Sequence, residues 1–426
     1  MGAYPIVSKY YILLIIMAFK NFPETGASKE NILDILENFA KKMKPYSMRG
    51  LRIYSTDPHP LAIEAITKFL PFNRNNIGTH TSNEYASGLQ YLEAEVISML
   101  SNLFGLEKGD GYLTQGGTEG NITGLWIGRN MLQENGGKLC LLKTPLTHYS
   151  IEKAADLLNI NKVVDVPCDT EYGMDGEKLK ETIKLLYQEG YNNFLIALTL
   201  GYSGTGTVDP LNEIDAVIND FQSKLKIKTY VHMDAAIGGL VYPFVSEKIL
   251  DFRYSSLQSI SLDMHKTGLV PHNAGVFLCR KGLQNFIERP VPYLGLGKDN
   301  TLSGSRPAAI AAGCWSIIML LGKSGFKKIV ESELNLKKYF IEASMANEYL
   351  PPFIFITHPS INILAFHINK LKNSQLDPQT EKRFGLKPCW LLHDGEKKLF
   401  YTIIFMPHIT KKIIDEFFAS LKWYKK

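Results

Sequence analysis

Short apolar segments alternate with amphipathic segments through the middle of this chain, and this alternation limits the folds that it can adopt. Residues 150–158 and 176–188 have apolar positions at helical spacing. Six other segments have the length and apolar composition of buried strands: residues 139–142, 163–166, 194–200, 230–233, 259–262 and 275–278. The pattern predicts an α/β fold with a mostly parallel sheet, and ligands of such sheets bind at the carboxyl ends of the strands.

The pattern differs on either side of this region. Residues 31–44 and 89–103 predict amphipathic helices, and Gly105 ends the second. After about residue 330, two strands at 361–368 and 399–406 precede a closing helix capped by Thr410, which predicts a smaller α+β domain. Three parts are expected in these 426 residues: an N-terminal arm and helical segment (1–60), a large domain (61–325) and a small C-terminal domain (326–426).

Composition argues against several classes of protein. The net charge of +5 comes from scattered lysines, so nucleic-acid binding is not expected. The five cysteines are odd in number and lack close spacing, which predicts free thiols in a reducing cytoplasm and disfavours a zinc site. No paired His, Asp or Glu spacing indicates another metal, and neither a serine-hydrolase elbow nor a P-loop lysine is present.

Residues 10–19 form an apolar stretch between Lys9 and Lys20. The stretch is well short of the roughly 20 residues that span a bilayer, and no small-residue cleavage site follows it. We therefore expect no stable membrane anchor. The stretch is interpreted either as a packing arm or as an extension upstream of a start at Met17.

Two charged residues end segments that are predicted to be buried strands. Asp234 follows the strand at 230–233, and Lys266 follows the strand at 259–262. A buried charge is costly unless it has a partner. Pyridoxal 5'-phosphate (PLP) requires both types, because a lysine forms a Schiff base with its aldehyde and a carboxylate pairs with its ring nitrogen. Taken singly, Asp234 could instead cap a helix, and Lys266 could lie at the surface.

Two further segments fit the same cofactor. Gly117 and Thr118 precede a helical stretch, where backbone N–H groups and the helix dipole bind phosphate. His148 follows a strand, and an imidazole there can stack on a pyridine ring and move protons. Each could also be an ordinary turn or loop residue. The hydroxyl-rich loop 199–207 could bond the cofactor's phenolate oxygen, although turn formation explains most of its residues.

In this order and spacing, the segments 115–119, 148–150, 232–236, 265–266 and 301–307 resemble the group II PLP-dependent amino-acid decarboxylases. The resemblance covers residues 60–410 and is strongest to the archaeal tyrosine and aspartate decarboxylases. Residues 301–322 are also similar to sphingosine-phosphate lyases, which share the fold and cofactor. The resemblance implies a PLP-dependent transferase-like large domain of fold type I and a homodimer with shared active sites.

The resemblance also implies a role for individual residues. Lys266 would hold the cofactor, Asp234 would keep its ring nitrogen protonated, and His148 and Ala236 would lie against opposite faces of the ring. Gly117, Thr118 and His265 would bind the phosphate, and Ser303 and Ser305 would reach the partner subunit's site. Tyr293 would donate a proton, and Arg306 would be a substrate-binding cation. His80 and Tyr85 are candidates for selecting the substrate, although they could equally be packing residues.

One position departs from the family pattern. Many of these decarboxylases have an arginine in the small-domain strand that grips the substrate's α-carboxylate, whereas Thr402 stands there in this chain. Either another cation such as Arg306 or Lys398 serves, or the substrate lacks a free α-carboxylate. We expect decarboxylation of an aromatic, imidazole or acidic L-amino acid, with aldehyde-releasing carbon–carbon cleavage as the alternative and a catalytically inactive PLP-fold protein as a third interpretation.

Overall fold

The computed structural model describes residues 25–43, 45, 50–72, 78–79, 88–134, 136–294, 297–304, 306, 308–346, 348–369 and 375–421. The chain divides into two compact units, Met1–Pro45 and Tyr46–Lys426. In the first unit, α2 (Lys29–Ala40) is the amphipathic helix expected over residues 31–44, and the side chain of Ser28 caps it by accepting the N–H of Asn31. Within this unit no residue of α2 is buried.

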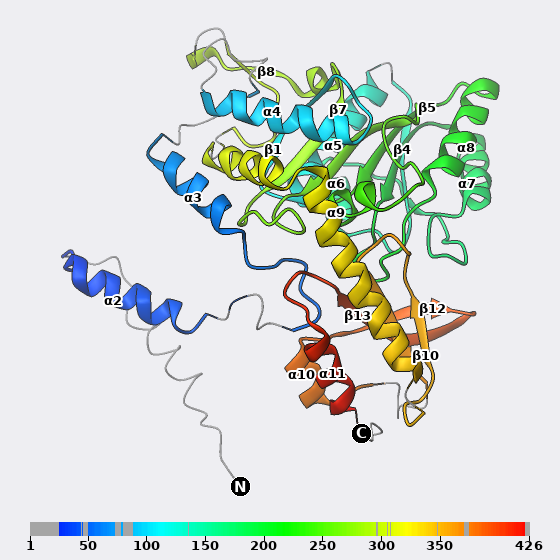
Figure 1. Ribbon diagram of the computed structural model, residues 1–426. Helices are drawn as coiled ribbons and strands as arrows, with labels where there is room; N and C mark the ends of the chain where they lie inside the picture. Colours follow the sequence, from blue (N-terminus) through cyan, green and yellow to red (C-terminus); the bar gives the residue numbers. More distant parts are fainter. Residues whose placement is uncertain are drawn as a thin grey trace. The chain divides into compact units, whose positions relative to one another are not determined.

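A seven-stranded sheet forms the centre of the second unit, with strand order β1-β7-β6-β5-β4-β2-β3 (Figure 1). The strands are β1 (Gly109–Thr114), β2 (Lys138–Lys143), β3 (Val163–Asp165), β4 (Tyr191–Thr199), β5 (Lys228–Asp234), β6 (Leu257–Asp263) and β7 (Gly275–Arg280). Strands β2 to β6 pair in parallel, and β7 is antiparallel to both β1 and β6. The predicted α/β fold with a mostly parallel sheet is therefore confirmed.

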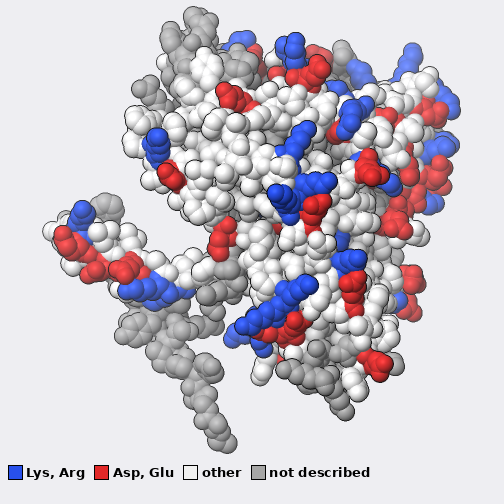
Figure 2. All heavy atoms as spheres, viewed as in Figure 1, with Lys and Arg blue, Asp and Glu red and all other residues white. Residues whose placement is uncertain are grey.

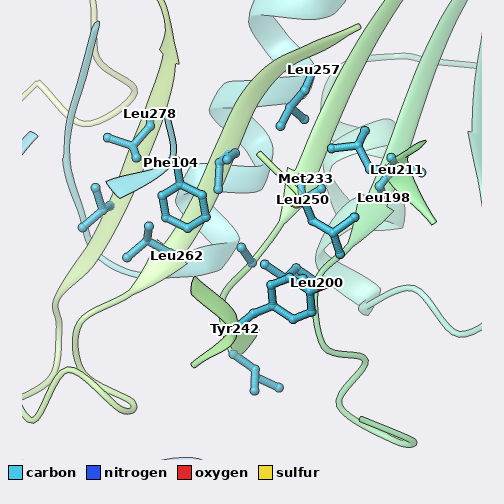
Figure 3. Close-up of a cluster of buried hydrophobic side chains, with 14 of the residues drawn as sticks. Phe104, Leu198, Leu200, Leu211, Met233, Tyr242, Leu250, Leu257, Leu262 and Leu278 are labelled. Carbon is cyan, nitrogen blue, oxygen red and sulfur yellow. The ribbon is translucent and has the colours of Figure 1, made fainter. Parts of the chain in front are cut away.

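Both faces of this sheet are buried, because successive residues of a strand point to opposite sides. Leu198 and Met233 belong to the core cluster on one face of the sheet (Figure 3). Ala197 and Tyr230 belong to the cluster on the other face. The helices of the large domain are α3 (Pro60–Phe69), α4 (Gly88–Leu103), α5 (Gly117–Gln133), α6 (Tyr149–Leu157), α7 (Gly176–Gln188) and α8 (Leu211–Lys224). The predicted helices at 150–158 and 176–188 correspond to α6 and α7.

Strand β1 was not expected from the sequence. It contains Gly109 and Gly111, so it lacks the continuous apolar run of a buried strand. The register explains this composition, because a Cβ atom on Gly111 would overlap the carbonyl oxygen of Phe277 in β7. A close backbone approach, rather than an apolar side chain, is what this position requires.

The long helix α9 (Ala309–Ala346) leads from the large sheet to a four-stranded sheet of order β10-β11-β13-β12 (Figure 1). The small sheet contains β10 (Phe353–Ile356), β11 (Ile363–Ile368), β12 (Pro388–His393) and β13 (Glu396–Ile404), and α10 (Pro378–Phe384) and α11 (Lys411–Ser420) accompany it. Thr410 caps α11, as predicted, by accepting the N–H of Ile413. We propose that the domains divide near residues 325 and 326, close to Gly322, where φ of 54° interrupts the helix.

Among the described residues, α9 is the one helix whose length and apolar composition would allow it to cross a membrane. It packs against α3 and α4, and Ala311, Cys314 and Ile317 on it are buried in the core of the large domain. The short elements of the second unit are η2 (Leu70–Phe72), η3 (Gly238–Leu240), η4 (Tyr242–Phe244), η5 (Leu283–Ile287), η6 (Pro292–Leu294), β8 (Arg289–Pro290) and β9 (Lys298–Asp299).

Figure 2 shows basic and acidic side chains interspersed on one face of the molecule. A nucleic-acid-binding surface gathers its lysines and arginines into a patch or stripe. The mixed charges on this face agree with the scattered lysines of the sequence.

The side chain of Lys337 connects α9 by hydrogen bonds to the loop that precedes β11. Its side chain is buried, and Nζ donates to the carbonyl oxygens of His358 (2.7 Å) and Ile361 (2.6 Å) and to Oγ1 of Thr357 (3.2 Å). Replacing Lys337 by alanine leaves these acceptors, of which the Ile361 carbonyl is buried, without their donor, so we expect the free energy of unfolding to fall by about 3 kcal/mol. Urea denaturation measures the change, and Lys338→Ala, at an exposed neighbouring position, is the matched control. Equal stabilities of the two variants would contradict this account.

Candidate active site

A cavity of about 800 Å³ lies where three parallel strands end. The last residues of β4, β5 and β6 are Thr199, Asp234 and Asp263, and all three line it. The complete described wall consists of residues 52–55, 115–119, 121–122, 148–149, 199, 201–203, 234, 236–237, 263, 265–266, 272 and 302–303. The cavity is therefore at the carboxyl edge of the sheet, where the sequence predicted a ligand site.

Glycines allow α5 to lie directly on the sheet. Gly120, Gly124 and Gly128 recur at helical spacing along one face of this helix. A Cβ atom on Gly120 would overlap Ser261 of β6, and one on Gly124 would overlap His232 of β5. This close packing carries the N-terminus of α5 to the cavity, where its first N–H groups and its dipole favour an anion.

The carboxylate of Glu119 fixes the turn that begins α5. Its Oε2 accepts the backbone N–H of Gln115 at 2.8 Å, and its Oε1 accepts the hydroxyls of Tyr112 at 3.3 Å and Ser303 at 3.1 Å. The glycine at the N-cap, Gly116, has a φ of 149°. The turn is thus held from β1 and from the segment around residue 303 before any ligand is bound.

Asn121 holds the carboxylate of Asp234. Its Nδ2 donates to Asp234 Oδ2 at 2.7 Å, while the backbone N–H of Ala236 donates to Oδ1 at 3.0 Å. Asn121 Oδ1 accepts the hydroxyl of Ser261 at 2.5 Å and lies 2.9 Å from Nε2 of His232. Burial lowers the pKa of His232 to about 3, so its ring is neutral. The network fixes both the amide orientation and the position of the carboxylate.

The same asparagine reaches His148 through Ser150. Asn121 Nδ2 donates to Ser150 Oγ at 2.8 Å, and Oγ lies 2.8 Å from Nδ1 of His148. The backbone N–H of Ser150 also donates to Nδ1, so this nitrogen is an acceptor and Nε2 carries the proton of the neutral ring. Desolvation lowers the pKa of His148, although the charge of Asp234 partly opposes the shift. His148 is therefore a neutral imidazole with its N–H at Nε2.

Lys266 lies on the turn that follows β6. Its Nζ is 3.0 Å from Oδ2 of Asp263 and 5.9 Å from the ring centre of Tyr54. The preceding residue, His265, is buried and its Nδ1 lies 3.0 Å from the carbonyl oxygen of Ala274. Desolvation lowers the pKa of His265, which favours its neutral ring.

The cavity thus combines four chemical capabilities. Asp234 can hold a protonated ring nitrogen, Lys266 can attack an aldehyde, the N-terminus of α5 can bind a phosphate, and His148 can contact a ring and hold a proton. Among the described residues, no group of three or more His, Cys, Asp or Glu side chains is placed to hold a metal.

The family of the chain follows from its sequence relatives. Residues 29–369 match the pyridoxal-dependent decarboxylase conserved domain. The chain belongs to this decarboxylase family. It is 32% identical to the L-aspartate/L-glutamate decarboxylase of Pyrococcus horikoshii, over 94% of this chain and 98% of that protein. It is 31% identical to the probable L-tyrosine/L-aspartate decarboxylase of Methanosphaera stadtmanae, over 93% of this chain and 97% of that protein.

Solved structures show the same fold for this decarboxylase. An L-methionine decarboxylase from Streptomyces superimposes with a TM-score of 0.80 at 16% identity, covering 94% of this chain and 96% of that one. A sphingosine-1-phosphate lyase from Burkholderia pseudomallei gives a TM-score of 0.77 at 18% identity, covering 95% and 93%. The predicted fold type I architecture is confirmed, and the likeness to the lyase is one of fold.

The protein is a PLP-dependent amino-acid decarboxylase, and the residues of the cavity fit this cofactor. Thr199 Oγ1 and Asp263 Oδ1 are buried and have no hydrogen-bond partner within the described part of the chain. A Cβ atom at Gly117 would crowd Ala236 at 3.1 Å and Asp263 Oδ2 at 3.3 Å, so glycine is what keeps the backbone of this turn open to the cavity. Polar atoms without partners beside open backbone are typical of a site completed by a polar ligand.

Most of the residues that we expected to form the decarboxylase site lie together in the cavity wall. Gly117, Thr118, His148, Asp234, Ala236, His265, Lys266 and Ser303 all line it. Ser303 lines the cavity of its own chain, and its expected reach into the partner subunit's site stays a prediction. His80, Tyr85, Ser305 and the apolar stretch 10–19 fall outside the described residues.

Arg306 and Tyr293 do not lie where we expected them. The guanidinium of Arg306 is buried in an ion pair with Glu93 and donates to the carbonyl oxygens of Leu113 and Gly78, and none of these three residues lines the cavity. Tyr293 is 82% exposed on η6 and is not part of the described wall. Thr402 is buried and donates to the carbonyl oxygen of Gly204 at 2.8 Å, also outside that wall.

Asp263, Asn121 and Arg52 are among the residues of this wall that were not predicted. Asp263 ends β6 as Asp234 ends β5, so the argument that identified Asp234 applies equally to it. Asn121 is a polar residue on the glycine face of α5, one helical turn after Gly117. Arg52 carried no comparable signal, because only the folded chain brings its segment to the carboxyl edge of the sheet.

Proposed function

We propose that this decarboxylase acts on an acidic L-amino acid, aspartate or glutamate, and that Arg52 binds the side-chain carboxylate. Arg52 is the one arginine among the described residues of the cavity wall, and this observation carries the proposal. A guanidinium matches a carboxylate with two parallel hydrogen bonds. The substrates in the names of the relatives from Pyrococcus and Methanosphaera, aspartate and glutamate among them, support the same choice.

Neighbouring backbone contacts hold Arg52 in position. Its Nη1 donates to the carbonyl oxygen of Lys387 at 2.9 Å. Leu51, the preceding residue, is fully buried, donates to the carbonyl oxygen of Phe384 and accepts the N–H of Ile404. A cation paired with the side-chain carboxylate selects an acidic substrate without holding the carboxylate that leaves as neutral carbon dioxide. We therefore assign Arg52 to the carboxylate that stays on the product.

Each cavity residue has a proposed part in the reaction. Asp234 would hold the proton on the cofactor's ring nitrogen, Lys266 would bind the aldehyde, and Gly117, Thr118, His265 and Ser303 would surround the phosphate. His148 and Ala236 would contact opposite faces of the ring. Bound PLP supplies an electron sink for the electron pair left when carbon dioxide departs. The imidazole of His148, which lies in the cavity wall, is the proposed proton donor to the α-carbon; it would take up a proton from solvent, donate it as the imidazolium and return to the neutral ring.

A substrate panel tests the proposed reaction. PLP-loaded protein is supplied with L-aspartate, L-glutamate, L-tyrosine and L-histidine, each labelled at the α-carboxyl carbon, and also with a phosphorylated amino alcohol. The proposal predicts labelled carbon dioxide, with the highest kcat/KM for an acidic substrate. Release of an aldehyde from the amino alcohol, without carbon dioxide from any amino acid, would favour the carbon–carbon lyase instead.

Arg52 provides a sharper test of substrate choice. Replacing it by alanine leaves the substrate's second carboxylate unpaired, so we expect kcat/KM for the preferred acidic substrate to fall on the order of 100-fold. Activity on the amide analogue, which lacks that charge, should change little. Arg383→Ala, at an exposed position on α10, is the control. An equal loss for the acid and its amide would show that Arg52 does not select the carboxylate.

We propose that the enzyme is a cytoplasmic homodimer. Its five free cysteines support the location. The apolar stripe on α2, formed by Ile32, Ile35, Leu36 and Phe39, is not buried within its own unit, and a second copy of the chain is the partner that we propose for it. Lysine and acidic residues flank the stripe, and such a mixed surface is self-complementary across a two-fold axis.

Analytical ultracentrifugation should give twice the 48.0 kDa chain mass for the wild type. Replacing Ile35 and Phe39 together by glutamate places charge on the apolar stripe, so we expect a shift toward the monomer at micromolar concentration. Asn38→Glu adds charge elsewhere on the same helix and should leave the dimer intact. A wild-type monomer at all concentrations would contradict the proposal.

A further inference from the structure

Asp209 is a buried carboxylate just outside the described wall of the cavity. It follows the loop 199–207 and is 1% exposed. Its Oδ2 accepts the backbone N–H of Thr199 at 2.6 Å, and its Oδ1 accepts the backbone N–H of Met174 at 2.7 Å. The hydroxyl of Tyr202 lies 2.9 Å from Oδ1 and 2.8 Å from Oδ2. Asp209 is an acceptor in all these contacts, which is the role of an ionised carboxylate.

Two of these donors belong to the cavity wall. Thr199 and Tyr202 both line it. The next backbone N–H after Thr199, that of Leu200, donates to the carbonyl oxygen of Asp234 at 2.8 Å. A buried backbone N–H that loses its acceptor is costly, so Asp209 fixes the part of the wall that adjoins Asp234.

A chain of hydroxyl groups leads from Tyr202 to the turn before His148. The hydroxyl of Tyr202 lies 2.7 Å from Oγ1 of Thr144, which lies 3.2 Å from Oγ1 of Thr147. The backbone N–H of Thr144 also donates to Oγ1 of Thr147 at 3.2 Å. The next residue, His148, is the N-cap of α6. The chain therefore connects Asp209 with the residue that adjoins His148.

The charge on Asp209 sets the direction of this chain. An ionised Asp209 accepts the proton of Tyr202, and the Tyr202 oxygen then accepts the proton of Thr144. A protonated Asp209 must donate its new hydrogen, and of its three partners only Tyr202 has an oxygen to accept it. Tyr202 must then donate to Thr144, so the chain reverses as far as Thr147.

We propose that Asp209 is a positioning residue of this decarboxylase, whose ionised carboxylate fixes the hydroxyl chain from Tyr202 to Thr147 and with it the position of His148. Asp209 acts through these residues, because it does not itself line the described wall. The inference rests on His148 as the proposed proton donor and is independent of the choice of substrate.

The titration of Asp209 supports this role. Burial raises the pKa of Asp209 to about 7, although the hydrogen bond from Tyr202 opposes the shift. Among the described residues, Tyr202, Cys168 and Asp169 are titratable groups that act on it. Burial raises the pKa of both Tyr202 and Cys168, so the two are neutral at pH 7, and the charge of Asp169 adds to the rise. The ionised form of Asp209 is therefore lost as pH falls through about 7.

The pH dependence of kcat tests the proposal in PLP-loaded wild type and Asp209→Asn, with the best substrate of the panel. An asparagine amide carries no charge, so we expect wild-type kcat to exceed that of the variant on the order of tenfold at pH 8.5, at similar KM. The ratio should fall toward one as pH drops below about 7. Asp175→Asn, which removes another carboxylate that accepts two backbone N–H groups, is the matched control. A ratio that is the same at every pH, or a loss confined to KM, would overturn the proposal.

The variant Tyr202→Phe identifies the group that titrates. It removes a donor to the ionised carboxylate, so the pH at which kcat falls should move upward. Titration of His148 acts in the opposite direction, because an imidazolium donor is lost as pH rises. If Tyr202→Phe leaves the fall of kcat at the wild-type pH, a group other than Asp209 causes it, and the proposal fails.

A measurement without substrate separates this proposal from the assignment of the proton donor. Nuclear magnetic resonance of PLP-loaded enzyme, with nitrogen-15 in the histidine rings, follows His148 through the signal that is missing in His148→Gln. That signal should shift near pH 7 in the wild type and not in Asp209→Asn, because reversal of the chain reaches Thr147. The same pH dependence in both proteins would contradict the coupling. Wild-type kcat in His148→Gln would instead contradict the proton donor alone, and the resonance shift would still decide whether Asp209 positions His148.

Discussion

Replacing Lys266 by alanine is expected to lower kcat on the order of 10³-fold or more and to remove the visible absorbance of lysine-bound cofactor. Lys266 is the one lysine among the described residues of the cavity wall, so no other lysine of that wall can bind the aldehyde in its place. Covalent binding by a lysine splits a difficult step into easier ones, and its loss is rarely compensated. Absorbance spectra and carbon dioxide release measure the two effects.

The matched control is Lys224→Ala, which removes an exposed lysine on α8. It should retain the wild-type spectrum and the wild-type rate. Circular dichroism shows whether both variants are folded. If Lys266→Ala keeps the absorbance and most of the activity, the assignment of this lysine is wrong.

Replacing Asp234 by asparagine is expected to lower kcat on the order of 10³-fold while PLP remains bound to Lys266. An amide cannot supply the negative charge that keeps a ring nitrogen protonated, and breaking a buried charge pair costs about 4 kcal/mol. Asn121 already donates to Asp234 Oδ2, so the new amide would also meet a second donor at that position.

The Asp234→Asn variant distinguishes the role of Asp234 at the ring nitrogen from the role of Lys266 at the aldehyde. The spectrum of lysine-bound cofactor should persist in Asp234→Asn and disappear in Lys266→Ala, although both lose activity. Asp220→Asn, on the solvent side of α8, controls for the loss of a carboxylate. A wild-type rate in Asp234→Asn would show that this carboxylate does not act on the ring.

Local sequence was sufficient for some of this site and not for the rest. Asp234 and Lys266 were predictable, because a charge at the end of an apolar strand needs a partner. Asp263 obeys the same rule, because it too is a charged residue at the end of an apolar strand. Strand β1 was missed because its glycines serve a close backbone contact with β7.

The substrate side of the site depends on contacts between distant parts of the chain. Arg306 has the charge expected of a carboxylate-binding residue, yet Glu93, more than 200 residues earlier, neutralises it in the core. Arg52 comes to the cavity because Leu51 is bonded to residues near 384 and 404. Neither fact is encoded in local composition or spacing.

The cofactor's attachment point is the central claim, and borohydride reduction of the PLP-loaded wild type tests it most directly. Reduction fixes the cofactor to the amine that holds it, and proteolysis followed by mass spectrometry locates the labelled peptide. We predict that the label is found on the peptide containing Lys266 and that no other lysine is labelled in stoichiometric amount. A label on a different lysine, such as the buried Lys143 outside the cavity wall, would contradict the proposed site.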